Sequence, residues 1–390
     1  MARRLSASAA IGVALAAAAM AGACASAGRG SPAPQPSART AAGPSPAVTI
    51  QPIATPGSSV MPDIVRARRP GPLAGELVTA TPAAGRCRDP YVTPTASPEP
   101  PSTPADPAAT PTPERIFHPA DVPAAATPDL PPVVIDAELE RRISGRLGDQ
   151  ASHYAVLVKD LSNDRGVSID GDRVFYAASL FKLEVMYEIF HQRAAGLLNF
   201  GERYVPTDYY TSFGLGPRLV SQCEPVSIAD ALTAMMAISD NTAAVMLQDR
   251  AGAGHVNDAM TALGLQHTRL TEDQSLPGTA ADFGRLLEAI ARGQAVDREA
   301  SQAMADLLAT ETINDRIPRE LPPGTLVAHK TGNWTDATHD AGIVYGERSA
   351  YVMVLMSDIG PDGDAGSVEA DIAKIAWDYF EGAATPAAGN

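Results

Sequence analysis

Three short motifs carry residues that could perform acyl-transfer chemistry. In the first, Ser179 and Lys182 are three positions apart, which places both side chains on one face of a helix. A serine hydroxyl becomes a nucleophile when a base removes its proton, and a lysine can be that base if burial and a nearby cation lower its pKa. Unpaired N–H groups at a helix N-terminus would also stabilise developing negative charge. Alone, however, this spacing is common in helices.

The second motif is Ser239-Asp240-Asn241, after a helix that we expect to begin near Ser227. Its hydroxyl and amide groups could relay a proton and hold a substrate carbonyl. The same residue types favour helix caps, so the motif alone favours an ordinary turn.

The third motif, Lys330-Thr331-Gly332, lies on a β-rich run. Lysine supplies a charge for an anionic substrate group, threonine a hydroxyl, and glycine lets a ligand approach the strand closely. Alone, it favours an ordinary strand end. The chain has only four lysines against 26 arginines, and two of the four fall in these motifs. Because a buried lysine can deprotonate and arginine effectively cannot, a base at position 182 has a reason to be lysine.

Together the motifs and their surroundings resemble those of the class A β-lactamases, within the penicillin-recognising serine enzymes. The resemblance runs from about residue 133 to the C-terminus and includes the stretches AASLFKL, AISDNTAAVML, AHKTGNW and HDAGIV. It implies that Ser179 is acylated, that Lys182 takes part in its activation, and that Ser239 passes a proton to the leaving nitrogen. It also implies the substrate-binding residues: Asn241 for a side-chain amide, Lys330 and Thr331 for a carboxylate, Gly332 beside them, and the backbone N–H of Asn333, which would form an oxyanion hole with that of Ser179.

The resemblance implies a serine hydrolase that opens β-lactam amides through an acyl-serine intermediate. Two alternatives remain: a cell-wall D-alanyl peptidase or transpeptidase, and a non-catalytic binding module with this fold. The expected partner is a small β-lactam or a cell-wall peptide, and the protein is expected to be a monomer. No Cys/His spacing resembles a metal site, so we expect no metal ion and no cofactor.

One departure from the family concerns the loop between the second and third motifs. In the family this loop carries a Glu, followed four residues later by Asn, that positions the water for deacylation. Here residues 269–284 look shortened, and Leu276 stands four positions after Glu272. Glu272 is either a rebuilt base or, as we favour, a solvated loop carboxylate, so deacylation would be slow. The family's arginine near the third motif is also missing, and Arg316 or Arg319 would substitute for it.

Strand-like runs occur at both ends of the domain, beginning at Tyr154, and again in GTLVAHKTG, HDAGIVYG and AYVMVLMSD. Helical patterns begin at Asp136 and near Val368, and a helical block runs from Ser179 to about Leu308. This order predicts an α/β (α+β) fold of the β-lactamase/transpeptidase kind. An antiparallel sheet built from both ends of the domain would be flanked by helices, with an all-helical subdomain beside it.

The first 25 residues resemble a signal peptide, with Arg3 and Arg4 before a short apolar run and small residues after it. Cys24 stands where a lipoprotein cysteine would stand. The chain would then be exported, and either tethered to the membrane through Cys24 or cleaved near Ala23 or Ala25 and secreted.

Residues 26–132 are expected to form a disordered Pro-rich tether, because 25 of the 34 prolines fall at or before Pro132. Residues 133–390 are then the catalytic domain. The formal net charge of −15 comes from this domain, and an acidic domain repels nucleic acid, which excludes a nucleic-acid partner. Cys87 and Cys223 could form a disulfide in an oxidising compartment, but the sequence leaves this open.

Overall fold

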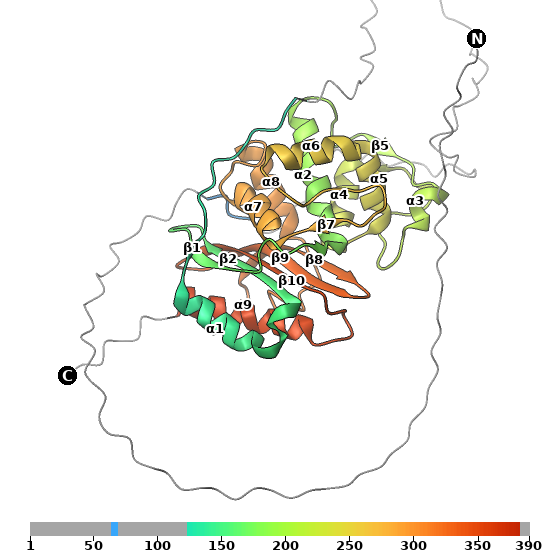
Figure 1. The fold of residues 1–390 in the computed structure, drawn as a ribbon. Helices are drawn as coiled ribbons and strands as arrows, with labels where there is room; N and C mark the ends of the chain where they lie inside the picture. The colour runs from blue at the N-terminus through green and yellow to red at the C-terminus, as the bar shows by residue number, and fades with distance from the viewer. Residues whose placement is uncertain (1–63, 69–122, 383–390) are drawn as a thin grey trace, which may run out of the picture. The chain divides into compact units, whose positions relative to one another are not determined.

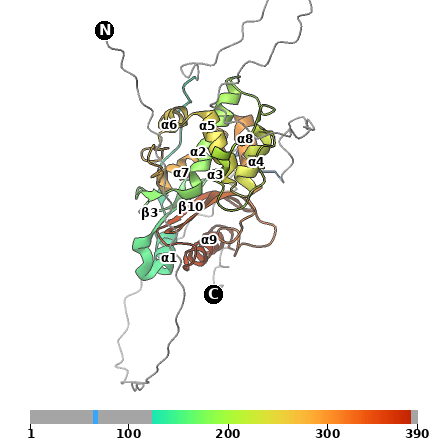
Figure 2. The same cartoon turned by 90° about the vertical axis from the view of Figure 1, so that its right-hand side faces the viewer.

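The computed structural model describes residues 64–68 and 123–382, and its central element is a six-stranded sheet (Figures 1 and 2). The strand order is β1-β3-β2-β10-β9-β8, and every neighbouring pair is antiparallel except β1 with β3. Because β2 pairs with β10, the sheet is built from both ends of the domain, as predicted. The strands are β1 (Val134–Ile135), β2 (Tyr154–Asp160), β3 (Arg165–Ile169), β8 (Leu326–Trp334), β9 (Ala337–Tyr345) and β10 (Ala350–Ser357).

Helices cover both faces of this sheet (Figure 1). On one face lie α1 (Ala137–Leu147) and α9 (Ala365–Glu381), which contact each other. The predicted helical block lies on the other face and contains α2 (Phe181–Ala194), α3 (Asp208–Ser212), α4 (Ile228–Ala237), α5 (Asn241–Ala251), α6 (Ala253–Ala262), α7 (Ala280–Ala291) and α8 (Arg298–Leu308). Two short two-stranded sheets join its loops: β4 (Phe175–Tyr176) with β7 (Pro277–Gly278), and β5 (Arg203–Tyr204) with β6 (Val226–Ser227).

Local sequence explains why α1 forms and which face it buries. The Asp136 side chain caps the helix by accepting hydrogen bonds from the Glu138 and Leu139 N–H groups, both at 3.1 Å. Its apolar residues recur at helical spacing and are buried against the sheet: Leu139, Ile143 and Leu147.

The strands divide their side chains between two cores. In β2, Val156 and Val158 pack in the core under α1 and α9, whereas Ala155 and Leu157 pack in the core under the helical block. All eight residues of β10 are buried, which fits its position in the middle of the sheet. On the helical side, every residue of α2 from Lys182 to Gln192 is buried, so α2 is the central helix of the block.

Two parts of the predicted tether are packed on the domain rather than free. Val65 is 1% exposed, and its N–H donates to the Ala291 carbonyl at the end of α7, 2.6 Å away. Closer to the domain, the Thr127 hydroxyl donates to the Ala262 carbonyl at 2.8 Å, and the Pro131 carbonyl accepts from Lys159 at 2.5 Å. Residues 64–68 and 123–132 therefore depart from the predicted tether.

The predictions for the signal peptide, for Cys24 and Cys87, and for the rest of the tether lie outside the described residues. Within the two described ranges, no helix is long and apolar enough to cross a membrane.

We expect a chain of residues 123–390 to fold and to keep its chemistry, but to be less stable than residues 26–390. Losing the buried Val65 side chain alone should cost about 2 kcal/mol of unfolding free energy. Urea unfolding of the two chains measures this difference. Val65→Asp in the longer chain should lose about this 2 kcal/mol. The shorter chain should lose more, because Cys223 is disulfide-bonded and residues 123–390 contain no other cysteine. Identical midpoints for Val65→Asp and the unchanged longer chain would show that this contact contributes nothing.

Candidate active site

Ser179 lies where β4 gives way to α2, in a 3₁₀ turn over Ala178–Leu180. The turn is fixed on its β4 side, where the Ala177 N–H donates to the Leu276 carbonyl at 2.8 Å. Ala178 has a φ of 47°, a left-handed conformation that is costly for a residue with a Cβ. The strained turn presents a half-buried Ser179 at the start of the central helix, as the sequence predicted.

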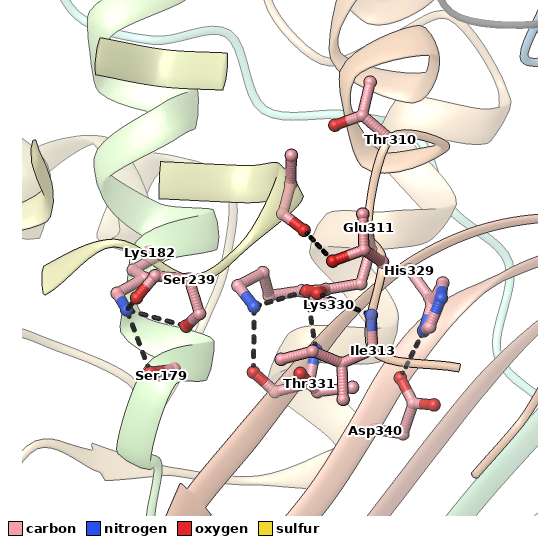
Figure 3. A network of polar contacts seen from close by, with 12 residues as sticks. Ser179, Lys182, Ser239, Thr310, Glu311, Ile313, His329, Lys330, Thr331 and Asp340 are labelled. Atoms are coloured by element: carbon pink, nitrogen blue, oxygen red, sulfur yellow. Dashed lines mark hydrogen bonds and ion pairs between the residues drawn. The ribbon is translucent and has the colours of Figure 1, made fainter. Parts of the chain in front are cut away.

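Lys182 is fully buried and joins this turn to the second motif (Figure 3). Its Nζ lies 3.0 Å from the Ser179 Oγ, 2.8 Å from the Ser239 Oγ and 2.7 Å from the Ser239 carbonyl oxygen. It also lies 2.7 Å from the Asn241 Oδ1. The predicted nucleophile, base and proton relay therefore meet at one nitrogen atom.

The hydrogen bonds around this nitrogen suit a neutral amine. The Ser239 carbonyl and the Asn241 Oδ1 can only accept, and the Asn241 amide is oriented by its own donation to the Leu215 carbonyl at 2.9 Å. A neutral amine gives its two hydrogens to these acceptors and keeps its lone pair for a serine hydroxyl. Burial, followed by the charge of Lys330, holds the pKa of Lys182 well below its usual range.

The second motif is the turn between α4 and α5, and hydrogen bonds to its Asp240 side chain hold neighbouring segments to this turn. Ser239 has a φ of 60°, and Asp240 caps α5 by accepting from the Ala243 N–H at 3.1 Å. The other Asp240 oxygen accepts from the N–H groups of Leu219 and Val220 at 2.7 and 2.9 Å. The capping interpretation and the catalytic one are therefore compatible, since Asp240 makes the turn that aims its two neighbours at Lys182.

The third motif lies on β8, at the edge of the sheet. Lys330 and Thr331 are buried, and the Lys330 Nζ lies 2.5 Å from the Glu311 Oε2 (Figure 3). A Cβ at Gly332 would lie 3.2 Å from the Ala177 carbonyl oxygen. The missing side chain at position 332 thus lets β8 pass close to the Ser179 turn, whereas the sequence suggested an approach by a ligand. Asn333 is exposed, and its oxyanion role stays a prediction.

Residues 310–319, which follow α8, lie beside β8 and are held there by hydrogen bonds. His329 lies between Asp340, with Nδ1 2.9 Å from Oδ1, and Asn314, with Nε2 3.1 Å from Oδ1. The other Asp340 oxygen accepts from the Ile317 N–H at 3.0 Å. This cluster fixes the segment that carries Glu311 at one end and Arg316 at the other.

Arg316 is the better of the two predicted substitutes for the family's arginine. It is 2% exposed and donates to the Asn333 Oδ1 at 2.5 Å and to the His339 carbonyl at 3.0 Å. Arg319 is about half exposed and donates to Ser367, away from the third motif.

His339 is a neutral structural group rather than a base. Its Nδ1 accepts from the Ser357 N–H at 3.1 Å, so Nε2 carries the proton and donates to the Tyr176 carbonyl at 2.8 Å. Burial lowers its pKa to about 4. The side chain therefore ties β9 and β10 to β4, the strand that leads into Ser179.

The shortened loop is compact, and Glu272 points to solvent. The Thr271 hydroxyl closes the loop by accepting from the Leu276 N–H at 3.2 Å and lies 3.1 Å from the Ser275 hydroxyl. Glu272 is exposed and makes no hydrogen bond or ion pair with any described residue. This placement fits the solvated carboxylate that we favoured.

The site also contains residues that the motifs did not reveal. Glu311, the partner of Lys330, lies far from any motif in the sequence, and no spacing rule identifies it. Among the residues that the structure describes, no group of three or more His, Cys, Asp or Glu side chains could hold a metal ion.

A sequence model of the beta-lactamase enzyme family matches residues 138–380. The chain belongs to the beta-lactamase enzyme family. Among solved structures, PBP-A is similar with a TM-score of 0.61 and 22% identity over 65% of this chain and 99% of that protein. A β-lactamase from Sphaerobacter thermophilus has a TM-score of 0.58 and 22% identity over 62% and 97% of the two chains. For an ancestral class A β-lactamase the TM-score is 0.56, with 21% identity over 62% and 100%. No curated protein matches the chain.

The family assignment made from the three motifs and the fold predicted from the order of strands and helices are thereby confirmed. At these identities the solved structures establish the shared fold, and the roles of individual residues rest on the geometry above.

We expect Lys182→Arg to slow acylation by a penicillin by about 10²–10⁴-fold, because arginine stays protonated and cannot take the Ser179 proton. The measurement is the rate of covalent labelling with a fluorescent penicillin. Lys374→Arg, at a half-exposed lysine paired with Asp378, is the matched control and should label at the wild-type rate. Unchanged labelling of Lys182→Arg would remove Lys182 from the role of base.

We expect His339 to make the domain less stable in acid. Its pKa is about 4 when folded and about 6.5 when unfolded, so the unfolded chain binds the proton first as the pH falls between these values. The stabilisation is complete above about pH 6.5 and is lost as the pH falls through 4, a change of about 3 kcal/mol. Urea unfolding at pH 7 and pH 4 should show a larger loss for wild type than for His339→Gln. Parallel losses would contradict this assignment.

Proposed function

We propose that this protein is a serine hydrolase that opens β-lactam amides through an acyl-serine intermediate and releases the product slowly. The observation that carries the proposal is the buried Lys182 amine, 3.0 Å from the Ser179 hydroxyl and 2.8 Å from the Ser239 hydroxyl. A base, a nucleophile and a proton donor at these distances are what acyl transfer to serine requires.

In the proposed acylation, the Lys182 Nζ accepts the Ser179 proton while the Oγ attacks the lactam carbonyl carbon. The developing oxyanion is stabilised by the N–H groups of Ser179 and Asn333. When the carbon–nitrogen bond breaks, the nitrogen takes a proton from the Ser239 hydroxyl, and Lys182 returns a proton to Ser239. The result is a ring-opened ester on Ser179, with no net loss or gain of protons.

The solved relatives support this chemistry. A variant of PBP-A was solved as an acyl-enzyme complex with penicillin G, and it shares the fold at 22% identity. The substrate carboxylate would be bound at the third motif, where Lys330 and Thr331 lie on β8 with Arg316 beside Asn333.

Slow deacylation is proposed from the shortened loop. Removal of the acyl group needs a base aimed at a water molecule beside the ester. Glu272 is exposed and unpaired among the described residues, and Leu276 stands where the family has its Asn. Without general-base assistance, deacylation loses about 10²–10⁴-fold in rate.

The second candidate is a cell-wall D-alanyl peptidase or transpeptidase with the same acylation steps. The loop favours it, because such an enzyme does not depend on rapid hydrolysis of a β-lactam ester. A non-catalytic binding module is the third candidate, and it would form no covalent product with a β-lactam.

We also propose that the protein acts outside the cytoplasm as a monomer, either secreted or anchored through Cys24. The N-terminal sequence pattern supports export. Cys223 is disulfide-bonded, which suits an oxidising compartment.

The proposal predicts a burst of about one product per enzyme on mixing with a chromogenic cephalosporin, followed by slow turnover. Intact mass spectrometry should show one adduct, and Ser179→Ala should show none while staying folded. Glu272→Gln should change the steady rate little. Rapid turnover without a burst, together with accumulation of the acyl-enzyme in Glu272→Gln, would make Glu272 a working base and the protein an efficient β-lactamase.

Turnover of D-alanyl peptides without turnover of the cephalosporin would favour the peptidase. Absence of any adduct on the wild type would leave only the binding module.

A further inference from the structure

Lys330 and Glu311 form an ion pair that is completely removed from solvent. The Nζ and the Glu311 Oε2 are 2.5 Å apart, and neither side chain has any exposed surface. The same Glu311 oxygen lies 3.4 Å from the Thr331 N–H, and the Thr331 carbonyl accepts from the Nζ at 3.1 Å. Glu311 therefore contacts both the side chain and the strand that carries it.

A buried ion pair of this kind contributes little to stability by itself, because desolvation of both ions offsets their attraction. A buried lysine without a partner releases its proton instead. For Lys330, burial lowers the pKa, and the charge of Glu311 together with its hydrogen bond opposes that shift. Glu311 thus acts to keep a cation where a substrate carboxylate would need one.

Other charges face Lys330 from each element around it. Asp340 on β9 raises the pKa of Lys330, and Arg316 in the segment beside β8 lowers it. Lys182 on α2 is repelled by Lys330 and is favoured as a cation by Glu311. The two effects on Lys182 oppose each other, so removing the Glu311 charge while Lys330 stays protonated lowers the pKa of Lys182 further.

We propose that Glu311 is a positioning residue for substrate recognition, which holds Lys330 in place and in its charged form so that β8 binds the substrate's carboxylate. The inference rests on the proposed acylation of Ser179 and adds a residue outside the three motifs. It also gives the segment after α8 a function, which is to place the Glu311 carboxylate beside Lys330 on the edge strand β8.

The test is Glu311→Gln, which keeps the shape of the side chain and removes its charge. Acylation is followed with penicillin G and with its methyl ester, which lacks the carboxylate, across pH 6 to 9. The matched control is Glu288→Gln, which removes a buried glutamate 2.7 Å from Lys159, at a site outside the catalytic motifs. It loses buried ion pairs with Lys159 and Arg292 without touching Lys330.

At pH 8 we expect penicillin G to acylate Glu311→Gln more slowly than wild type. The rate should fall about tenfold for each unit by which the pKa of Lys330 lies below 8. The loss should shrink towards pH 6, because Lys330 regains its proton there. The alkaline limb of the pH profile, set by Lys330, thus moves to lower pH. The acid limb, set by Lys182, moves in the same direction, because Lys182 loses the neighbouring negative charge of Glu311. At pH 8 the methyl ester should react equally with both proteins, and Glu288→Gln should react as wild type with both substrates.

Three results would overturn the inference. One is an equal loss for penicillin G and its methyl ester. Another is an alkaline limb that does not move, which means that Lys330 keeps its charge unaided. The third is an unaltered rate of Glu311→Gln with penicillin G. If wild type itself forms no adduct with penicillin G, the proposed function has failed, and that result is separate from these three.

Discussion

The arrangement of the site depends on the burial of one amine. Lys182 lies inside the central helix of the helical block, and its nitrogen is the point where the Ser179 turn and the Ser239 turn meet. Burial has two effects on it: it fixes the nitrogen within 3.0 Å of four oxygen atoms, and it favours the uncharged form that can accept a proton. The packing around Lys182 thus sets both the position of its nitrogen and the ability of that nitrogen to accept a proton.

The sequence predicted the elements that have strong local patterns. β-rich runs identified β2 and β10, helical spacing identified α1 and α9, and the first two motifs identified the residues that meet at Lys182. It could not predict contacts made by residues without a pattern. The packing of Val65 on α7, the pairing of Glu311 with Lys330, and the close passage of β8 past Ala177 depend on the folded chain alone.

The use of lysine is more selective than the sequence suggested. Two of the four lysines lie in motifs, and the structure adds Lys159, which is buried against Glu288. Only Lys374 lies on the surface, where arginine supplies most of the positive charge. Three of the four lysines thus lie in buried positions, where burial and neighbouring charges can change their protonation.

The pairing of β2 with β10 also has a consequence for the order of folding. The two strands in the middle of the sheet come from opposite ends of the domain, with the whole helical block between them. While the chain is being synthesised, the β2–β3 hairpin has no partner for its apolar edge until the last strands are available. Pairing over such a sequence distance is slow to nucleate. The domain therefore cannot complete its central sheet until its C-terminal strands are available.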